Sequence, residues 1–134
     1  MSRLPDPIDP PDWSRPSGYA NAMVAMGRVV ALAGQIGWDP QTRQIVSDDF
    51  VAQVRQALLN VAQVLQAAGA GPQEVVRLTW FITDKQAYVS RQKEVGTVYR
   101  EVMGKHFPAM SVVVVSALVE DRAKVEIEAT AVLP

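Results

Sequence analysis

Residues 106–115 read HFPAMSVVVV, and this stretch decides the fold class. Pro108 separates the expected end of a helix from a run of four valines that indicates a strand. The run from Val112 to Val115 lacks polar alternation, so both faces of this strand need apolar cover. The strand is therefore expected to lie in a sheet that is packed on both sides.

Helical and strand patterns alternate on either side of this stretch. Apolar residues recur at helical spacing over residues 50–68, with Ser47 as the expected N-cap and Gly69 as the expected C-terminal cap. A second helix is predicted over residues 87–103. Strands are predicted over residues 74–83, 111–118 and 124–132, preceded by a β-hairpin over residues 19–33 that turns at Gly27. The order β-β-α-β-α-β-β predicts an α+β fold with two helices on one face of a sheet.

Two helices can cover only one face of such a sheet. The valine run then requires that the opposite face pack against another copy of the chain. An oligomer is therefore expected from the residues alone.

Composition limits the classes of function. The 134 residues fit one domain, 49% of them are apolar, and the net charge of −1 with no basic tract does not indicate nucleic acid as a partner. The absence of cysteine excludes disulfides, thiol catalysis and thiolate metal sites. No secretion signal and no apolar run of membrane-spanning length is present, so a cytoplasmic protein without membrane association is expected. Five of the nine prolines lie within residues 1–16, which predicts an extended N-terminal arm before a single domain at residues 17–134.

Several short segments occur together in an order that resembles the RidA (YjgF-type) family. They are Gly18-Tyr19-Ala20-Asn21-Ala22, Ala33-Gly34-Gln35-Ile36 with Asp39-Pro40, Gln56-Ala57-Leu58 with Asn60-Val61, Ala67-Ala68-Gly69-Ala70, Thr79-Trp80-Phe81-Ile82-Thr83-Asp84, Pro108-Ala109 and Val125-Glu126-Ile127-Glu128-Ala129. The resemblance covers the chain from about residue 17 to its end. It implies a chorismate-mutase-like fold with a mixed sheet, a homotrimer, and a ligand cleft between each pair of adjacent subunits.

The resemblance also implies site residues. In active relatives an arginine clamps a substrate carboxylate, a glutamate places or activates water at an imine carbon, and a tyrosine and a backbone group of the Gly-Gln segment complete the cleft. The last three roles map onto Glu126, Tyr19 and Gly34, whereas the arginine position is Met110 and the next cleft position on that strand is Val112. An asparagine found on the second helix of relatives maps loosely onto a glycine, Gly96.

Met110 has no hydrogen-bond donor, so it cannot bind a carboxylate. Its side chain is expected either to form part of the wall around a ligand or to pack at a contact between subunits. Trp38, in a turn, either stacks over a ligand or covers a core edge. Glu128 lies two residues after Glu126 on the same face and is expected to be structural. The arginines are expected mainly on outer faces or turns, although Arg15 of the arm could reach a neighbour's cleft and replace the missing clamp.

Three functions are weighed. The leading hypothesis is hydrolysis of an imine, an enamine or a related small carbonyl compound, with Glu126 as catalytic residue and with no cofactor or metal. The alternative is a trimer that binds a metabolite without catalysis. Ribonuclease activity, which is sometimes ascribed to relatives, is disfavoured because the chain lacks a basic, aromatic patch.

Overall fold

The computed structural model describes residues 4–134, and the first three residues of the predicted arm lie outside the described residues. The helices are α1 (Phe50–Ala67), α2 (Lys85–Ser90) and α3 (Gln92–Met103), with a short 3-10 turn, η1 (Pro72–Glu74). The strands are β1 (Asp6–Ile8), β2 (Ala22–Val24), β3 (Arg28–Ile36), β4 (Trp38–Asp39), β5 (Gln44–Ile45), β6 (Val75–Ile82), β7 (Ala109–Val114) and β8 (Val125–Leu133).

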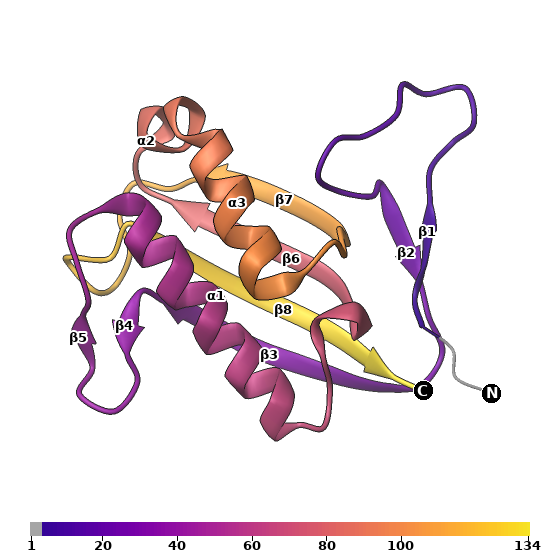
Figure 1. The fold of residues 1–134 in the computed structure, drawn as a ribbon, viewed down its shortest axis with the longest axis horizontal. Coiled ribbons are helices and arrows are strands. Elements are labelled where there is room, and N and C mark those ends of the chain that lie inside the picture. Colours follow the sequence, from indigo (N-terminus) through magenta and orange to yellow (C-terminus); the bar gives the residue numbers. More distant parts are fainter. Residues whose placement is uncertain (1–3) are drawn as a thin grey trace.

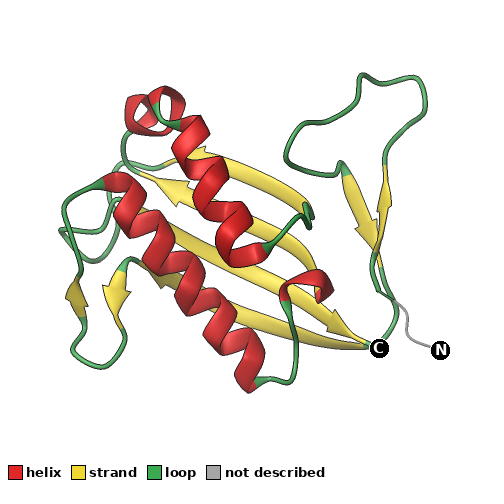
Figure 2. Cartoon of the chain, in the orientation of Figure 1, coloured by secondary structure: helices red, strands yellow, loops and turns green. Residues whose placement is uncertain are grey.

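A four-stranded mixed sheet in the order β3-β8-β6-β7 forms the centre of the molecule. β6 and β7 are parallel, whereas β8 is antiparallel to both β3 and β6. The two long helices α1 and α3 lie side by side on one face of this sheet (Figures 1 and 2). The predicted α+β fold, with its helices on one face, is confirmed.

The first helix forms where its apolar spacing predicts. Val54, Leu58, Val61 and Leu65 are fully buried against the sheet. Its N-cap, however, is Asp49, whose carboxylate accepts from the backbone N–H of Ala52 at 2.9 Å. The expected cap was placed two residues too early, because three consecutive positions here carry side chains that can cap a helix. Gly69 follows the helix with φ +82°, the left-handed conformation expected of a C-terminal glycine.

The second predicted helix is divided into α2 and α3. Asp84 starts α2 by accepting hydrogen bonds from the N–H groups of Gln86 and Ala87. Arg91 then leaves helical geometry, with φ −121° and ψ 27°, and its guanidinium binds both Glu94 and Asp49. Because Asp49 lies at the start of α1, this break depends on a distant contact that the helical pattern of residues 87–103 does not contain.

The predicted hairpin over residues 19–33 is wrong. β2 pairs with β1 of the arm in antiparallel register, and β3 pairs with β8. Asp9 closes the loop between β1 and β2 by accepting from both the backbone and the side-chain amide of Asn21 at 2.8 Å. Gly27, the expected turn residue, instead packs so closely on the end of β8 that a Cβ would lie 1.7 Å from the carbonyl oxygen of Leu133. Figure 1 shows the resulting β1–β2 ribbon beside the end of the sheet.

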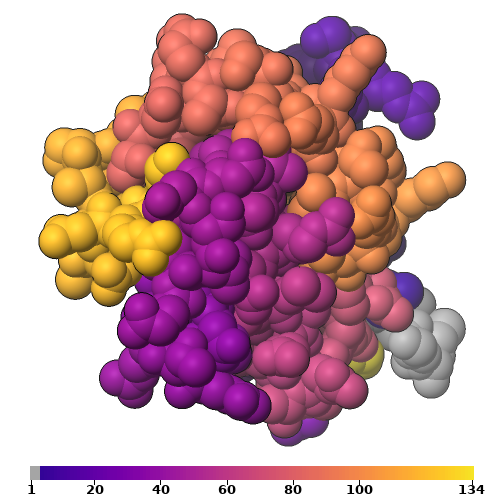
Figure 3. Space-filling view, turned by 60° about the vertical axis from the view of Figure 1, so that its left-hand side comes forward, coloured from indigo at the N-terminus to yellow at the C-terminus, as the bar shows by residue number. Residues whose placement is uncertain are grey.

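No helix of residues 4–134 lies on the opposite face of the sheet, which we call the bare face. It carries Phe81 of β6 beside Glu126 of β8, and Val113 of the edge strand β7 is 40% exposed. In the space-filling view α1 and α3 occupy the helix face, and the loop between β7 and β8 projects from one end (Figure 3). Cover of the bare face by another subunit stays a prediction.

Candidate functional site

A cleft of about 640 Å³ lies between α3, the edge of the sheet and the chain just before β2. Its walls come from Ser17, Gly18, Tyr19, Trp80, Tyr88, Gln92, Val95, Gly96, Tyr99, Arg100, Phe107, Met110 and Val112. Three of the residues predicted for ligand binding, Tyr19, Met110 and Val112, are therefore brought together. The described part of the chain contains no group of three or more His, Cys, Asp or Glu residues that could hold a metal ion.

The register of the strands explains this grouping. Met110 pairs with the buried Leu78 of the parallel neighbour β6, so its side chain points to the helix side of the sheet. Val112, two residues later, points the same way. Ala20 donates its N–H to the carbonyl of Pro108 at 3.0 Å, which holds Tyr19 at the edge of the same strand.

Two aromatic pairs form much of the wall. The rings of Tyr99 and Phe107 stack with centroids 5.5 Å apart, and those of Trp80 and Tyr88 meet edge-on at 6.3 Å. The hydroxyl of Tyr99 donates to the carbonyl of His106. A tyrosine hydroxyl is protonated at neutral pH and can donate a hydrogen bond, and burial raises the pKa of Tyr88 further.

One donor in this wall has no acceptor. Trp80 is 2% exposed, and its indole Nε1–H has no hydrogen-bond partner among residues 4–134. A buried N–H without a partner is costly, and such groups in native proteins usually have a function or an unseen partner.

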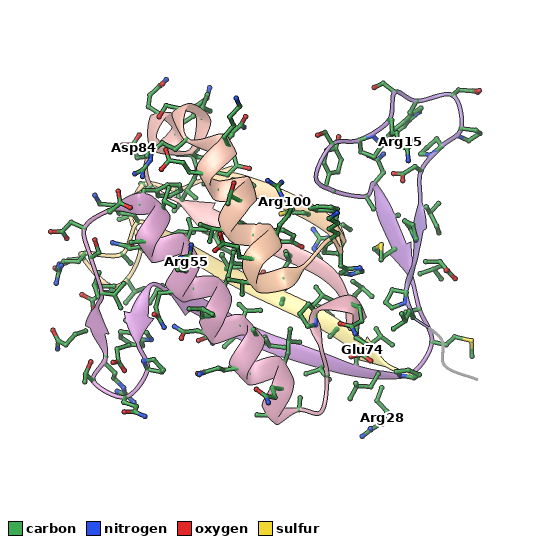
Figure 4. The ribbon with its side chains drawn as sticks, in the orientation of Figure 1. Arg15, Arg28, Arg55, Glu74, Asp84 and Arg100 are labelled. Carbon is green, nitrogen blue, oxygen red and sulfur yellow. The ribbon has the colours of Figure 1, made fainter. Side chains whose placement is uncertain are left out.

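Arg100 is the basic residue of this cleft (Figure 4). It is exposed, and it takes part in none of the ion pairs found in the described part of the chain. The sequence interpretation missed its position and assigned arginines mainly to outer faces. The available signal was its spacing of four residues from Gly96, which places both on one face of a helix. Arg15 lines a different hollow, which it shares with Tyr19 and His106.

Glu126 and Gly34 form a second group. Glu126 pairs with Phe81 and Ile36 and points away from the helices, so in one chain it lies across the sheet from Met110. Its half-buried carboxylate lies directly against Gly34, where a Cβ would come within 2.0 Å of Oε2. β3 is irregular at this point, with a register shift between Leu32 and Gln35. Glu128 is exposed on the same face.

Trp38 does not line the cleft. It lies in β4, half-buried, and its carbonyl accepts a hydrogen bond from the side chain of the buried Asn60 at 2.9 Å. Asn60 also donates to the carbonyl of Ile36, so it holds the segment between β3 and β4 on α1. No helix of residues 4–134 has the length and apolarity that crossing a membrane needs.

Comparisons with known proteins give one consistent result. The family model described as Endoribonuclease L-PSP matches residues 14–133. A RutC family protein of Pyrococcus horikoshii is 35% identical over 87% of this chain and 89% of its own length. The human 2-iminobutanoate/2-iminopropanoate deaminase is 33% identical over 85% of this chain and 79% of its own.

Solved structures agree. The Rid family protein YyfB of Yersinia pestis superposes with a TM-score of 0.86 at 31% identity and covers 97% of this chain and 99% of its own. TdcF of E. coli, solved with bound serine, superposes with a TM-score of 0.69 at 33% identity, covering 90% and 91%. The match of family, sequence and fold over nearly the whole chain shows that this protein belongs to the RidA (YjgF-type) family.

Proposed function

We propose that this protein hydrolyses an imine or enamine at clefts shared between adjacent subunits of a homotrimer. The observation that carries the proposal is the division of the predicted site residues. Tyr19, Met110 and Val112 line the cleft on the helix side, while Glu126 and Gly34 lie together on the opposite face. One chain cannot bring these groups together across its own sheet. The bare face of a neighbouring copy can bring Glu126 to the edge of the cleft.

The reaction needs only water and an acid–base group. Glu126 accepts a proton from water as the oxygen attacks the carbon of the protonated imine, and the adduct carries hydroxyl and amino groups on one carbon; an enamine first takes a proton on carbon to give the same iminium. The carboxyl group then returns its proton to the nitrogen, the carbon–nitrogen bond breaks and ammonia leaves, and the hydroxyl proton passes to the carboxylate as the carbonyl forms. Atoms balance with water as the only co-reactant, so the proposed step uses no cofactor or metal.

The relatives support this reaction class. They include proteins named 2-iminobutanoate/2-iminopropanoate deaminase from human and goat, both of which match 85% of this chain. Met110 stands where those active relatives are expected to carry arginine, so the substrate class of this chain is expected to differ. A homotrimeric state, a cytoplasmic location and the division at residue 16 into arm and domain stay predictions.

The decisive measurement is ammonia release from freshly generated imines. We expect turnover by the wild type, a loss of about 10²-fold or more in Glu126→Gln, and wild-type rates in Glu128→Gln. Glu128 is a matched control because it lies two residues away on the same strand and face, yet is exposed. Equal rates for wild type and Glu126→Gln would refute the proposal, and sedimentation showing only monomer would refute the shared cleft.

Binding without turnover is the second candidate. One observation favours it: the cleft on the helix side has no carboxylate of its own chain in its walls. Such a cleft can hold a ligand but offers no general base. Under this alternative a ligand binds in the cleft, and ammonia release stays at the background rate in every variant.

A further inference from the structure

We infer that Arg100 binds the carboxylate of the ligand, and that the body of this ligand is a planar apolar group held by the aromatic wall. The inference rests on the proposed function only in taking this cleft as the ligand site. It assigns a specificity-determining residue and a substrate class: organic acids with an aromatic or similarly flat side chain.

The charge of the cleft comes from a single side chain. Among residues 4–134, Arg100 is the one cation that lines the cleft, and no Asp or Glu lines it. Its guanidinium forms no ion pair with any carboxylate that the structure describes, unlike Arg55, Arg91 and Arg122. An arginine without a protein partner beside a cleft is suited to an anion, because its planar fork matches the geometry of a carboxylate.

Gly96 gives the Arg100 side chain room beside the helix. A Cβ at Gly96 would lie 3.3 Å from Nη1 of Arg100, tighter than an ordinary contact. Glycine costs stability inside a helix. At this position it leaves space for the guanidinium to lie along α3 toward the cleft. A larger side chain would push the charge outward.

The polar groups of the cleft favour an anion. The guanidinium of Arg100 offers donors only, and the hydroxyl of Tyr88 can also donate. A ligand bearing acceptor oxygens at one end satisfies the guanidinium, whereas a cation is repelled by its charge.

Apolar side chains also line the cleft. Met110 and Val112 form an apolar strip beside the rings of Trp80 and Phe107. Met110 offers a polarizable surface that favours aromatic contact. The volume of about 640 Å³ falls within the range of about 300–1,000 Å³ for small-molecule sites, so it accommodates more than a three-carbon acid.

Calorimetric titration of the intact protein with hydrocinnamate and with its neutral amide, hydrocinnamamide, tests the inference. We expect the wild type to prefer the acid, and Arg100→Gln to weaken acid binding by about tenfold or more while leaving amide binding unchanged. Arg100→Lys should retain part of the preference. Lys93→Gln is the matched control: it removes the same charge from the same helix, outside the cleft, and should bind the acid as the wild type does.

Two results would overturn the inference: equal affinity of Arg100→Gln and wild type for hydrocinnamate, or no preference of the wild type for acid over amide. An equal loss in Lys93→Gln would also overturn it, because the effect would then be one of net charge. The readout is binding, so it is independent of turnover. A protein that binds hydrocinnamate through Arg100 but releases no ammonia would refute the proposed hydrolysis and leave this inference standing.

Discussion

Replacing Gly34 by alanine should impair catalysis without unfolding the protein. The three heavy atoms nearest to a Cβ at this position all belong to the side chain of Glu126: Oε2 at 2.0 Å, Cδ at 2.7 Å and Cγ at 2.8 Å. Gly34 does not have a positive φ, so alanine brings no backbone strain. The clash can be relieved by movement of one half-buried, flexible carboxylate.

The size of the effect follows from that geometry. Oε2 must retreat by about 1.4 Å to reach an ordinary contact distance from the new methyl group. A catalytic group misplaced by about 1 Å can lose a factor of about 10², which corresponds to about 2.7 kcal/mol in the activation barrier. The free energy of unfolding should change by less than about 1 kcal/mol, because no rigid atom is displaced.

The assay compares ammonia release by wild type, Gly34→Ala, Glu126→Gln and the double variant. If Gly34 acts by positioning Glu126, alanine at residue 34 lowers the rate in the wild-type background and has no further effect beside Glu126→Gln. Wild-type turnover in Gly34→Ala would refute the reasoning. An additive loss in the double variant would show that Gly34 serves the site in some other way, for example through its backbone.

Three further predictions concern stability and pH. Gln53→Ala should lower the free energy of unfolding by about 2–4 kcal/mol, because the fully buried side-chain amide forms hydrogen bonds with three backbone groups. Urea titrations at fixed protein concentration measure this change, and a loss below about 1 kcal/mol would contradict the prediction. Gly96→Ala should raise the free energy of unfolding by about 0.5–1 kcal/mol, since outside the helix backbone the nearby atom among residues 4–134 belongs to the flexible Arg100. The same change should weaken binding of hydrocinnamate, and a reduced free energy of unfolding would point to a rigid neighbour. Burial raises the pKa of Tyr99, so the stability that its neutral hydroxyl contributes is complete below the unfolded pKa of about 10 and is lost as the pH rises further. Thermal melts from pH 8 to 11 should therefore decline less steeply in Tyr99→Phe, and identical slopes would contradict the assignment.

Local patterns were sufficient for the parts of the fold that depend on neighbouring residues. The apolar spacing of α1 and the β-rich character of residues 75–82 gave the correct elements, because burial of one face imposes those periods. The predicted hairpin is wrong because β2 pairs with β1 of the arm, and Asp9 supports that pairing through hydrogen bonds to Asn21, twelve residues away in the sequence. The prediction of one continuous helix over residues 87–103 is wrong for the same kind of reason, because the break at Arg91 depends on its contact with the distant Asp49.

The candidate site likewise divides into features that the sequence predicts and features that only the fold determines. The resemblance to the family makes Glu126 the acid–base candidate and shows that Met110 stands at the arginine position, and the identity of residue 110 then excludes a carboxylate clamp there, because methionine has no donor. The tertiary structure adds three facts: Glu126 lies against Gly34, it lies across the sheet from Met110, and Arg100 lines the cleft. Each depends on strand register or on helix packing, which join residues far apart in the chain, whereas periodicity and composition report only on local conformation.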